Sequence, residues 1–149
     1  MGGAQLLSDD VAPLDVAPPD VAIVGCGPVG ALLANLLGQA GLSVDIYDRE
    51  REVYALPRAV HFDGEVMRIF QAAGLADRIA KATRPSPYGA RYEDAAGRTL
   101  LIRRGTEGPG PHGWSGSWYF HQPLLEEILR DGLTRFPNVR VHLGHEVGS

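Results

Sequence analysis

The strongest constraint on the fold lies near the start of the chain, in the segment DVAIVGCGPVG over residues 20–30. A short apolar run, Val21 to Val24, is followed by glycines at positions 25, 27 and 30. The spacing G-x-G-x-x-G is a weak signal alone and gains weight only between a strand and a helix. The apolar run is typical of a buried parallel strand. The segment therefore predicts a strand, a glycine turn and a helix in direct succession.

The segment after the glycines has the period of a helix. Its apolar residues recur at steps of three and four and form the stripe by which such a helix packs on a core: Val29, Leu32, Leu33, Leu36, Leu37 and Ala40. Pro28 suits the first helical turn, and Gly41 suits the left-handed position at the end. The next strand is expected over Ser43–Tyr47. Strand, helix and strand then close within about 30 residues as a right-handed βαβ unit with parallel strands.

Each glycine has a separate task in such a unit. Gly25 allows the tight turn, Gly27 admits a pyrophosphate without a Cβ in the way, and Gly30 lets the helix lie close to the strand. An acidic residue is expected about 20 positions later to accept bonds from a ribose, and Asp48 stands at the predicted end of the second strand. Asp45 lies inside that strand and is less well placed. The alternative is a glycine turn without a ligand and a solvated Asp48.

The rest of the chain continues the alternation of helices and strands, which favours an α/β fold. The expected elements are helices over Asp63–Ala73 and Leu75–Ala82, strands over Tyr88–Glu93 and Thr99–Arg103, an amphipathic helix over Pro123–Phe136 and a strand over Val139–Leu143. Residues 1–19 are rich in Ala, Pro and Asp without a sustained period, and we interpret them as a disordered tail.

Composition excludes several other classes. A net charge of −4 argues against a nucleic-acid surface. The lone Cys26 excludes a disulfide framework and fits a cytoplasmic location; beside the turn we interpret it as a small residue that fits, although a helix N-terminus could lower its pKa. The uncharged run Val21–Val44 is interrupted by glycines and is not expected to span a membrane. His142 and His145 should face opposite sides of a strand, so no metal site is expected.

The cofactor is indicated by a resemblance. The segment LPRAVHFDGEVMR, residues 56–68, strongly resembles the flavoprotein aromatic hydroxylases, which are single-component FAD monooxygenases. Within them it is most similar to the 3-(3-hydroxyphenyl)propionate hydroxylase and phenol hydroxylase branch. The match includes Gly41-Leu-Ser-Val, Gln122-Pro123 and residues 135–140. The resemblance implies that residues 20–149 are the N-terminal portion of a Rossmann-like FAD-binding domain with a parallel sheet.

The resemblance also implies a set of cofactor-binding positions, which are Gly25, Gly27, Pro28, Val29, Gly30, Asp48, Arg49, Arg58 and Gln122. In the family the glycines cradle the FAD pyrophosphate, and the acid at the position of Asp48 holds the adenosine ribose. Arg58 corresponds to an arginine that reaches toward the flavin and its phosphates. Gln122 corresponds to a glutamine that contacts the cofactor near the ribityl chain. The alternatives are a plain surface arginine and a helix-capping glutamine. No catalytic residue is assigned.

The activity implied by the resemblance is hydroxylation of a phenolic small molecule. NAD(P)H is the electron donor, O2 is the co-substrate and a flavin hydroperoxide transfers the oxygen atom. Family members are several times longer than 149 residues, so we expect an N-terminal piece that is not competent alone; a homo-oligomer is left open. The alternatives are another FAD- or NAD-dependent oxidoreductase, or an inactive truncated nucleotide-binding module.

Overall fold

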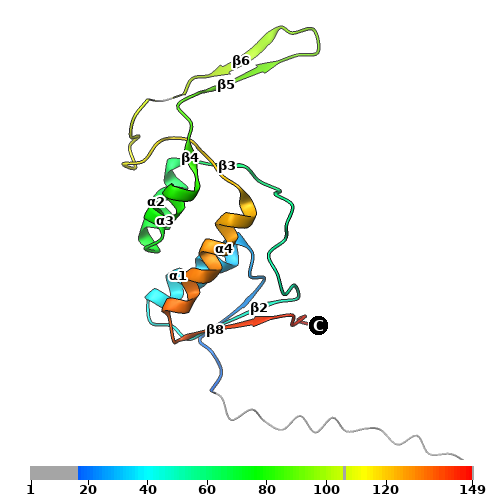
Figure 1. Cartoon of the computed structure of the whole chain (residues 1–149), viewed down its shortest axis with the longest axis vertical. Helices are drawn as coiled ribbons and strands as arrows, with labels where there is room; N and C mark the ends of the chain where they lie inside the picture. Colours follow the sequence, from blue (N-terminus) through cyan, green and yellow to red (C-terminus); the bar gives the residue numbers. More distant parts are fainter. Residues whose placement is uncertain (1–16, 106, 149) are drawn as a thin grey trace, which may run out of the picture.

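The computed structural model describes residues 17–105 and 107–148. The expectation of a disordered tail concerns mostly residues outside these ranges. The elements follow one another as shown in Figure 1: β1 (Val21–Val24), α1 (Pro28–Gln39), β2 (Val44–Asp48), β3 (His61–Phe62), α2 (Gly64–Ala72), α3 (Ala76–Ala82), β4 (Arg84–Pro85), β5 (Ala90–Glu93), β6 (Thr99–Arg103), β7 (Trp118–Tyr119), α4 (Gln122–Gly132), the 3-10 turn η1 (Leu133–Arg135) and β8 (Val139–Leu143). The α/β class is confirmed.

The predicted βαβ unit forms the base of the molecule. Strands β1, β2 and β8 make a parallel sheet in which β2 is central. Ile46 lies between Ile23 on β1 and Val141 on β8. Because β1 and β2 run in register, with Val24 opposite Tyr47, their carboxyl ends meet at the same sheet edge. The glycine turn and Asp48 are thereby brought together.

Helix α1 packs on β1 and β2, and its most deeply buried face is not its apolar stripe, of which Leu32, Leu36 and Leu37 pack against the core while staying partly exposed. The buried face consists of small or polar residues: Ala31, Ala34, Asn35 and Gly38. Val29 and Leu33 of the stripe are 81% and 42% exposed. The reason is the close approach of helix and strand, since a Cβ at Gly30 would lie 3.3 Å from Ile23 Cγ2. At that separation only small side chains fit between them.

The apolar stripe of α1 instead lines a groove of about 390 Å³ between α1, α2 and α4. Only apolar side chains line it: Pro28, Val29, Leu32, Leu33, Leu36, Phe62, Val66, Ile69, Phe70, Phe120, Leu125 and Leu129. Helix α4 packs against α1, and Asn35 fastens the two by donating to the carbonyl oxygen of Leu129 at 2.8 Å. The predicted helix over Pro123–Phe136 is α4 followed by the tighter turn η1.

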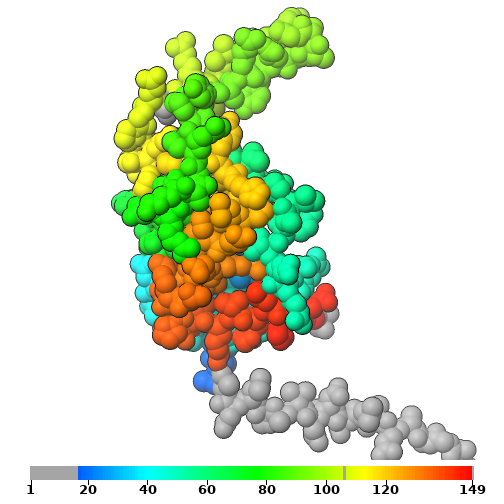
Figure 2. Space-filling view, viewed as in Figure 1, coloured from blue at the N-terminus to red at the C-terminus, as the bar shows by residue number. Residues whose placement is uncertain are grey.

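The antiparallel hairpin of β5 and β6 stands away from the helices and the parallel sheet (Figures 1 and 2). All of its strand residues are exposed. The turn between the strands contains Gly97, whose positive φ of 75° favours glycine. Among the described residues, no helix has the length and apolar character needed to cross a bilayer.

Candidate functional site

The turn between β1 and α1 is held by its first and third glycines. Gly25 has a φ of 103°, which favours glycine, and its N–H donates to the carbonyl oxygen of Tyr47 at 2.7 Å. A Cβ on Gly30 would lie only 1.9 Å from the carbonyl oxygen of Gly25. A Cβ on Gly27, by contrast, would meet nothing within 4 Å. Packing within the chain therefore explains Gly25 and Gly30, but leaves the space beside Gly27 open.

Helix α1 begins at this open space without a side-chain cap. Its N-cap residue is Gly27, Pro28 occupies the first turn, and no acidic residue follows in that turn. Helix α2 shows the usual solution, since its N-cap Asp63 accepts the N–H of Val66. The first turn of α1 thus keeps free N–H groups and the partial positive charge of the helix end. These are the features with which a helix binds phosphate.

Asp48 lies beside the turn at the end of β2. Its Oδ2 accepts the N–H of Cys26 at 2.7 Å, and its Oδ1 accepts the N–H of Glu50 at 2.9 Å. Each carboxylate oxygen has a second lone pair, so these bonds leave room for ribose hydroxyls. The Cys26 side chain is fully buried, and this burial raises the pKa of the thiol. Cys26 is therefore a small packed residue, and the lowered pKa considered from its position is wrong.

Gln122 and Arg58 come together although 64 residues separate them. The side-chain oxygen of Gln122 accepts the N–H groups of Arg58 at 2.8 Å and Ala59 at 2.9 Å. Gln122 is only 6% exposed and is the first residue of α4, whose N-cap is His121. Its oxygen thus fixes the Pro-Arg-Ala segment rather than the helix end. The Arg58 guanidinium is exposed and lies over the Tyr54 ring, 5.0 Å from its centroid.

Two other predicted cofactor-binding residues, Arg49 and Val29, lie exposed at the surface. The Arg49 side chain points to solvent and forms a surface ion pair with Glu50 at 3.3 Å. Val29 is exposed at the start of α1. The structure therefore brings together the glycine turn with Asp48, and Arg58 with Gln122, but gives Arg49 no buried partner within the described residues.

One residue at the turn is indicated by no local pattern in the sequence. Arg130, in the last turn of α4, donates from Nε to the carbonyl oxygen of Cys26 at 2.9 Å. It also pairs with the buried Glu126, four residues earlier on the helix. The i,i+4 spacing of an acid and a base was visible in the sequence, but it is typical of any exposed helix face. Only the packing of α4 against α1 reveals the partner in the turn.

Asp45, which lies inside β2, is less well placed than Asp48 to accept a ribose, because other side chains already bind its carboxylate oxygens. Arg140 donates to both of its oxygens, at 2.6 and 2.8 Å, and this holds the pKa of the Asp45 carboxyl below its ordinary value. His142 adds a contact at 3.2 Å.

The prediction that His142 and His145 face opposite sides is wrong, because β8 ends at Leu143 and the two rings lie 5.9 Å apart. Over residues 17–105 and 107–148, no three His, Cys, Asp or Glu side chains are grouped as metal ligands would be.

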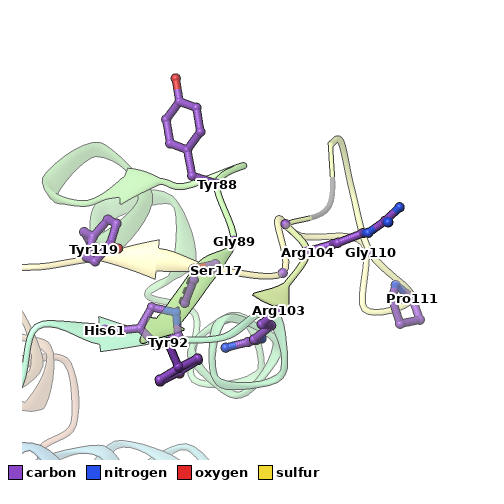
Figure 3. Close-up of a pocket in the computed structure, with 13 residues that line it drawn as sticks. His61, Tyr88, Gly89, Tyr92, Arg103, Arg104, Gly110, Pro111, Ser117 and Tyr119 are labelled. Atoms are coloured by element: carbon purple, nitrogen blue, oxygen red, sulfur yellow. Dashed lines mark hydrogen bonds between the residues drawn. The ribbon is translucent and has the colours of Figure 1, made fainter. Parts of the chain in front are cut away.

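A separate cavity of about 460 Å³ lies between β3, β7 and the base of the hairpin (Figure 3). Its most definite polar contact joins His61 Nε2 and Ser117 Oγ at 2.7 Å. Figure 3 shows Tyr88 directed away from this contact, and none of the predicted cofactor positions lines the cavity. We therefore assign it no role in cofactor binding.

A parallel βαβ unit, an open glycine turn at an uncapped helix start and an acid at the end of the next strand define a dinucleotide-binding domain. Comparison with known sequences specifies which one. The family model described as FAD binding domain matches residues 19–149. The chain belongs to this family.

The similar proteins include hydroxylases that are named for aromatic substrates. The chain is 40% identical over 131 residues to a 3-(3-hydroxy-phenyl)propionate/3-hydroxycinnamic acid hydroxylase of Comamonas testosteroni, covering 87% of this chain and 22% of the relative. It is 39% identical over 130 residues to a probable NADH-specific resorcinol 4-hydroxylase of Rhodococcus jostii, covering 87% and 24%. The predicted resemblance to the aromatic hydroxylases is confirmed.

Solved structures agree with the fold. The p-nitrophenol 4-monooxygenase PnpA from Pseudomonas putida aligns with a TM-score of 0.68 at 26% identity, covering 83% of this chain and 31% of that one. The flavin-dependent monooxygenase PieE, solved with FAD and substrate, aligns with a TM-score of 0.67 at 26% identity, covering 87% and 25%. The chain spans about a quarter of the length of the relatives it matches.

Proposed function

We propose that this chain binds FAD with the pyrophosphate at the turn between β1 and α1. The observation that carries the proposal is the open space beside Gly27, where a Cβ would meet no atom within 4 Å. Packing inside the chain does not require glycine there, whereas the approach of a pyrophosphate does. The uncapped start of α1 supplies the N–H donors that such an anion needs.

The other residues would act on the remaining parts of the cofactor. Asp48 would accept the adenosine ribose hydroxyls through the lone pairs that Cys26 and Glu50 leave free. Arg58 would place its planar guanidinium toward the flavin and the phosphates, since it is exposed and its backbone is fixed by Gln122. The side-chain nitrogen of Gln122 would complete the contact near the ribityl chain.

We further propose that a protein containing this domain hydroxylates a phenolic substrate in the cytoplasm. When bound, FAD would supply the redox chemistry, in which two electrons from NAD(P)H and one O2 would give a hydroxylated ring and one water. The hydroxylases among the relatives support this substrate class. Because the chain spans about a fifth of the first of them, substrate-binding residues are expected mostly in the part that it does not contain.

Cofactor binding can be tested with the purified chain. FAD is titrated while flavin fluorescence is followed, and ADP, FMN and NAD are then offered as competitors. We expect saturable FAD binding that ADP reduces and FMN does not, because ADP carries the adenosine and pyrophosphate that this turn contacts. Weaker binding by Asp48→Ala and Arg58→Ala would support the assigned roles. Binding of NAD without FAD would reject the proposal in favour of a different dinucleotide oxidoreductase.

A further inference from the structure

Arg130 contacts the glycine turn from a helix 104 residues further along the chain. Its Nε donates to the carbonyl oxygen of Cys26 at 2.9 Å, and its Nη2 pairs with Glu126 at 2.7 Å. The same nitrogen lies 3.7 Å from Asp48 Oδ2, and only 14% of the Arg130 side chain is exposed. The guanidinium therefore bridges the turn, the end of β2 and α4 in one buried cluster.

The bond to Cys26 determines how the next backbone N–H is directed. The peptide between Cys26 and Gly27 is trans and planar, so the carbonyl of one and the N–H of the other point in opposite directions. With the carbonyl held by Arg130, the Gly27 N–H points away from the guanidinium. In the described part of the chain this N–H donates to no protein group. Because Asp48 holds the Cys26 N–H at 2.7 Å, the turn is fixed from both sides.

The charge of Arg130 is already balanced within the cluster. Glu126 is 4% exposed and Asp48 15% exposed, and both carboxylates lie within 4 Å of its Nη2. A phosphate approaching Arg130 would have to compete with two fixed anions. Arg58, which is exposed, is the better candidate for direct contact with phosphate. Arg130 is therefore placed to orient the turn rather than to bind the cofactor itself.

We propose that Arg130 is a positioning residue for the cofactor: it holds the Cys26 carbonyl so that the Gly27 N–H is directed outward to the FAD pyrophosphate. This inference rests on the proposed FAD site. It adds a residue from the distant helix α4 to a site otherwise built from the βαβ unit. Its function would be to arrange the donor before the ligand arrives, which lowers the ordering cost of binding.

The test must separate positioning from stability. Arg130→Met alone would leave two uncompensated carboxylates and would destabilise the fold. The double variant Glu126→Gln/Arg130→Met removes Arg130 and its nearer carboxylate partner with little change in volume. Asp48 remains charged, but it lies farther from Arg130 and keeps the N–H bonds of Cys26 and Glu50, so the loss of stability is expected to be smaller than in Arg130→Met. The double variant still removes the donor to Cys26. We expect FAD to bind at least tenfold more weakly, and the Gly27 amide resonance of the ligand-free protein to shift or broaden in NMR spectra.

Arg135 provides a matched control. It lies in η1, directly after α4, and is more exposed than Arg130. Its guanidinium donates to the carbonyl oxygens of Gly132 and Ala73 and to the side-chain oxygen of Asn35, none of which belongs to the turn. Arg135→Met should lower stability but, under conditions where it is folded, leave the FAD dissociation constant unchanged. Equal losses of FAD affinity in the Arg135 and Arg130 variants would overturn the inference.

The outcomes for Glu126→Gln/Arg130→Met decide whether Arg130 positions the turn. Wild-type FAD affinity together with an unchanged Gly27 resonance would overturn the positioning role. If the wild-type chain itself binds no FAD, the proposed function fails independently of this inference. The Gly27 resonance of the ligand-free chain still decides: a changed signal in the double variant supports the orientation of the turn by Arg130, and an unchanged one refutes it.

Discussion

Replacement of Gly30 by alanine is the sharpest test of how the turn is packed. The added Cβ would lie 1.9 Å from the carbonyl oxygen of Gly25, whereas ordinary contact begins at 3.4 Å. The two groups must therefore separate by about 1.5 Å. Both belong to the backbone, so no flexible side chain can move aside, and β1 and α1 have to shift relative to each other. We expect the upper part of the range for overpacking, about 3 kcal/mol.

A gain in helix propensity opposes this cost. Alanine is favoured over glycine inside a helix by about 1 kcal/mol, and Gly30 lies in the first turn of α1. The net loss for Gly30→Ala is then about 2 kcal/mol in the free energy of unfolding. Gly27→Ala is the matched control, since its φ of −76° suits alanine and its Cβ meets nothing within 4 Å. We expect that control to remain within about 0.5 kcal/mol of the wild type.

Urea unfolding followed by circular dichroism measures both variants. The expected order is a clearly lower midpoint for Gly30→Ala and an almost unchanged midpoint for Gly27→Ala. Equal stability of Gly30→Ala and the wild type would refute the close approach of α1 to β1. A large loss for Gly27→Ala would show that packing, and not a ligand, requires glycine at that position.

Three further predictions concern other parts of the fold. Since Arg140 lowers the pKa of Asp45, this carboxylate stabilises the fold above its unfolded pKa of about 3.9 and ceases to do so as pH falls through the lower folded value. Asp45→Asn should therefore lose less free energy of unfolding than the wild type as the pH falls below about 4. The same dependence on pH in both proteins would argue against the pairing of Asp45 with Arg140. Asp63→Ala should lower the free energy of unfolding by about 1 kcal/mol, because the Asp63 side chain caps α2. Asp63→Asn should keep most of the stabilisation by the cap, so equal stability of the two variants would contradict the capping role. Val29→Glu, at the most exposed position of the stripe, should change stability by less than about 0.5 kcal/mol. Ala34→Leu, on the buried face, should cost about 1–3 kcal/mol, and the reverse order would show that the stripe is the more deeply buried face.

The local part of the fold could be predicted because its signals lie close together in the sequence. Pro28 and Gly41 mark the ends of α1, and the apolar run before Gly25 predicts β1. Asp48 could be placed beside the turn because parallel strands bring their carboxyl ends to one sheet edge, and the structure has β1 and β2 in that arrangement. These inferences need only the neighbouring residues and the known geometry of a βαβ unit.

The parts that failed depend on distances between elements. The apolar stripe of α1 predicts the buried face only in part, since Leu32, Leu36 and Leu37 pack against the core but Val29 and Leu33 are exposed. The period of a helix shows where leucines lie, but not how closely the strand approaches. The contact at Gly30 sets that distance and selects Ala31 and Ala34. Arg130 could not be found for the same reason. Its bond to Cys26 spans 104 residues and depends on the register of α4 against the turn, which no local pattern contains.

The central claim is that Gly27 is kept free of a side chain so that FAD can approach the start of α1. The most direct measurement is the dissociation constant for FAD of the wild-type chain and of Gly27→Ala. It is determined by equilibrium titration in buffer without urea, at a pH where both proteins are folded. We predict that Gly27→Ala binds FAD at least tenfold more weakly, while its unfolding midpoint stays at the wild-type value. Unchanged FAD affinity in a folded Gly27→Ala would contradict the account.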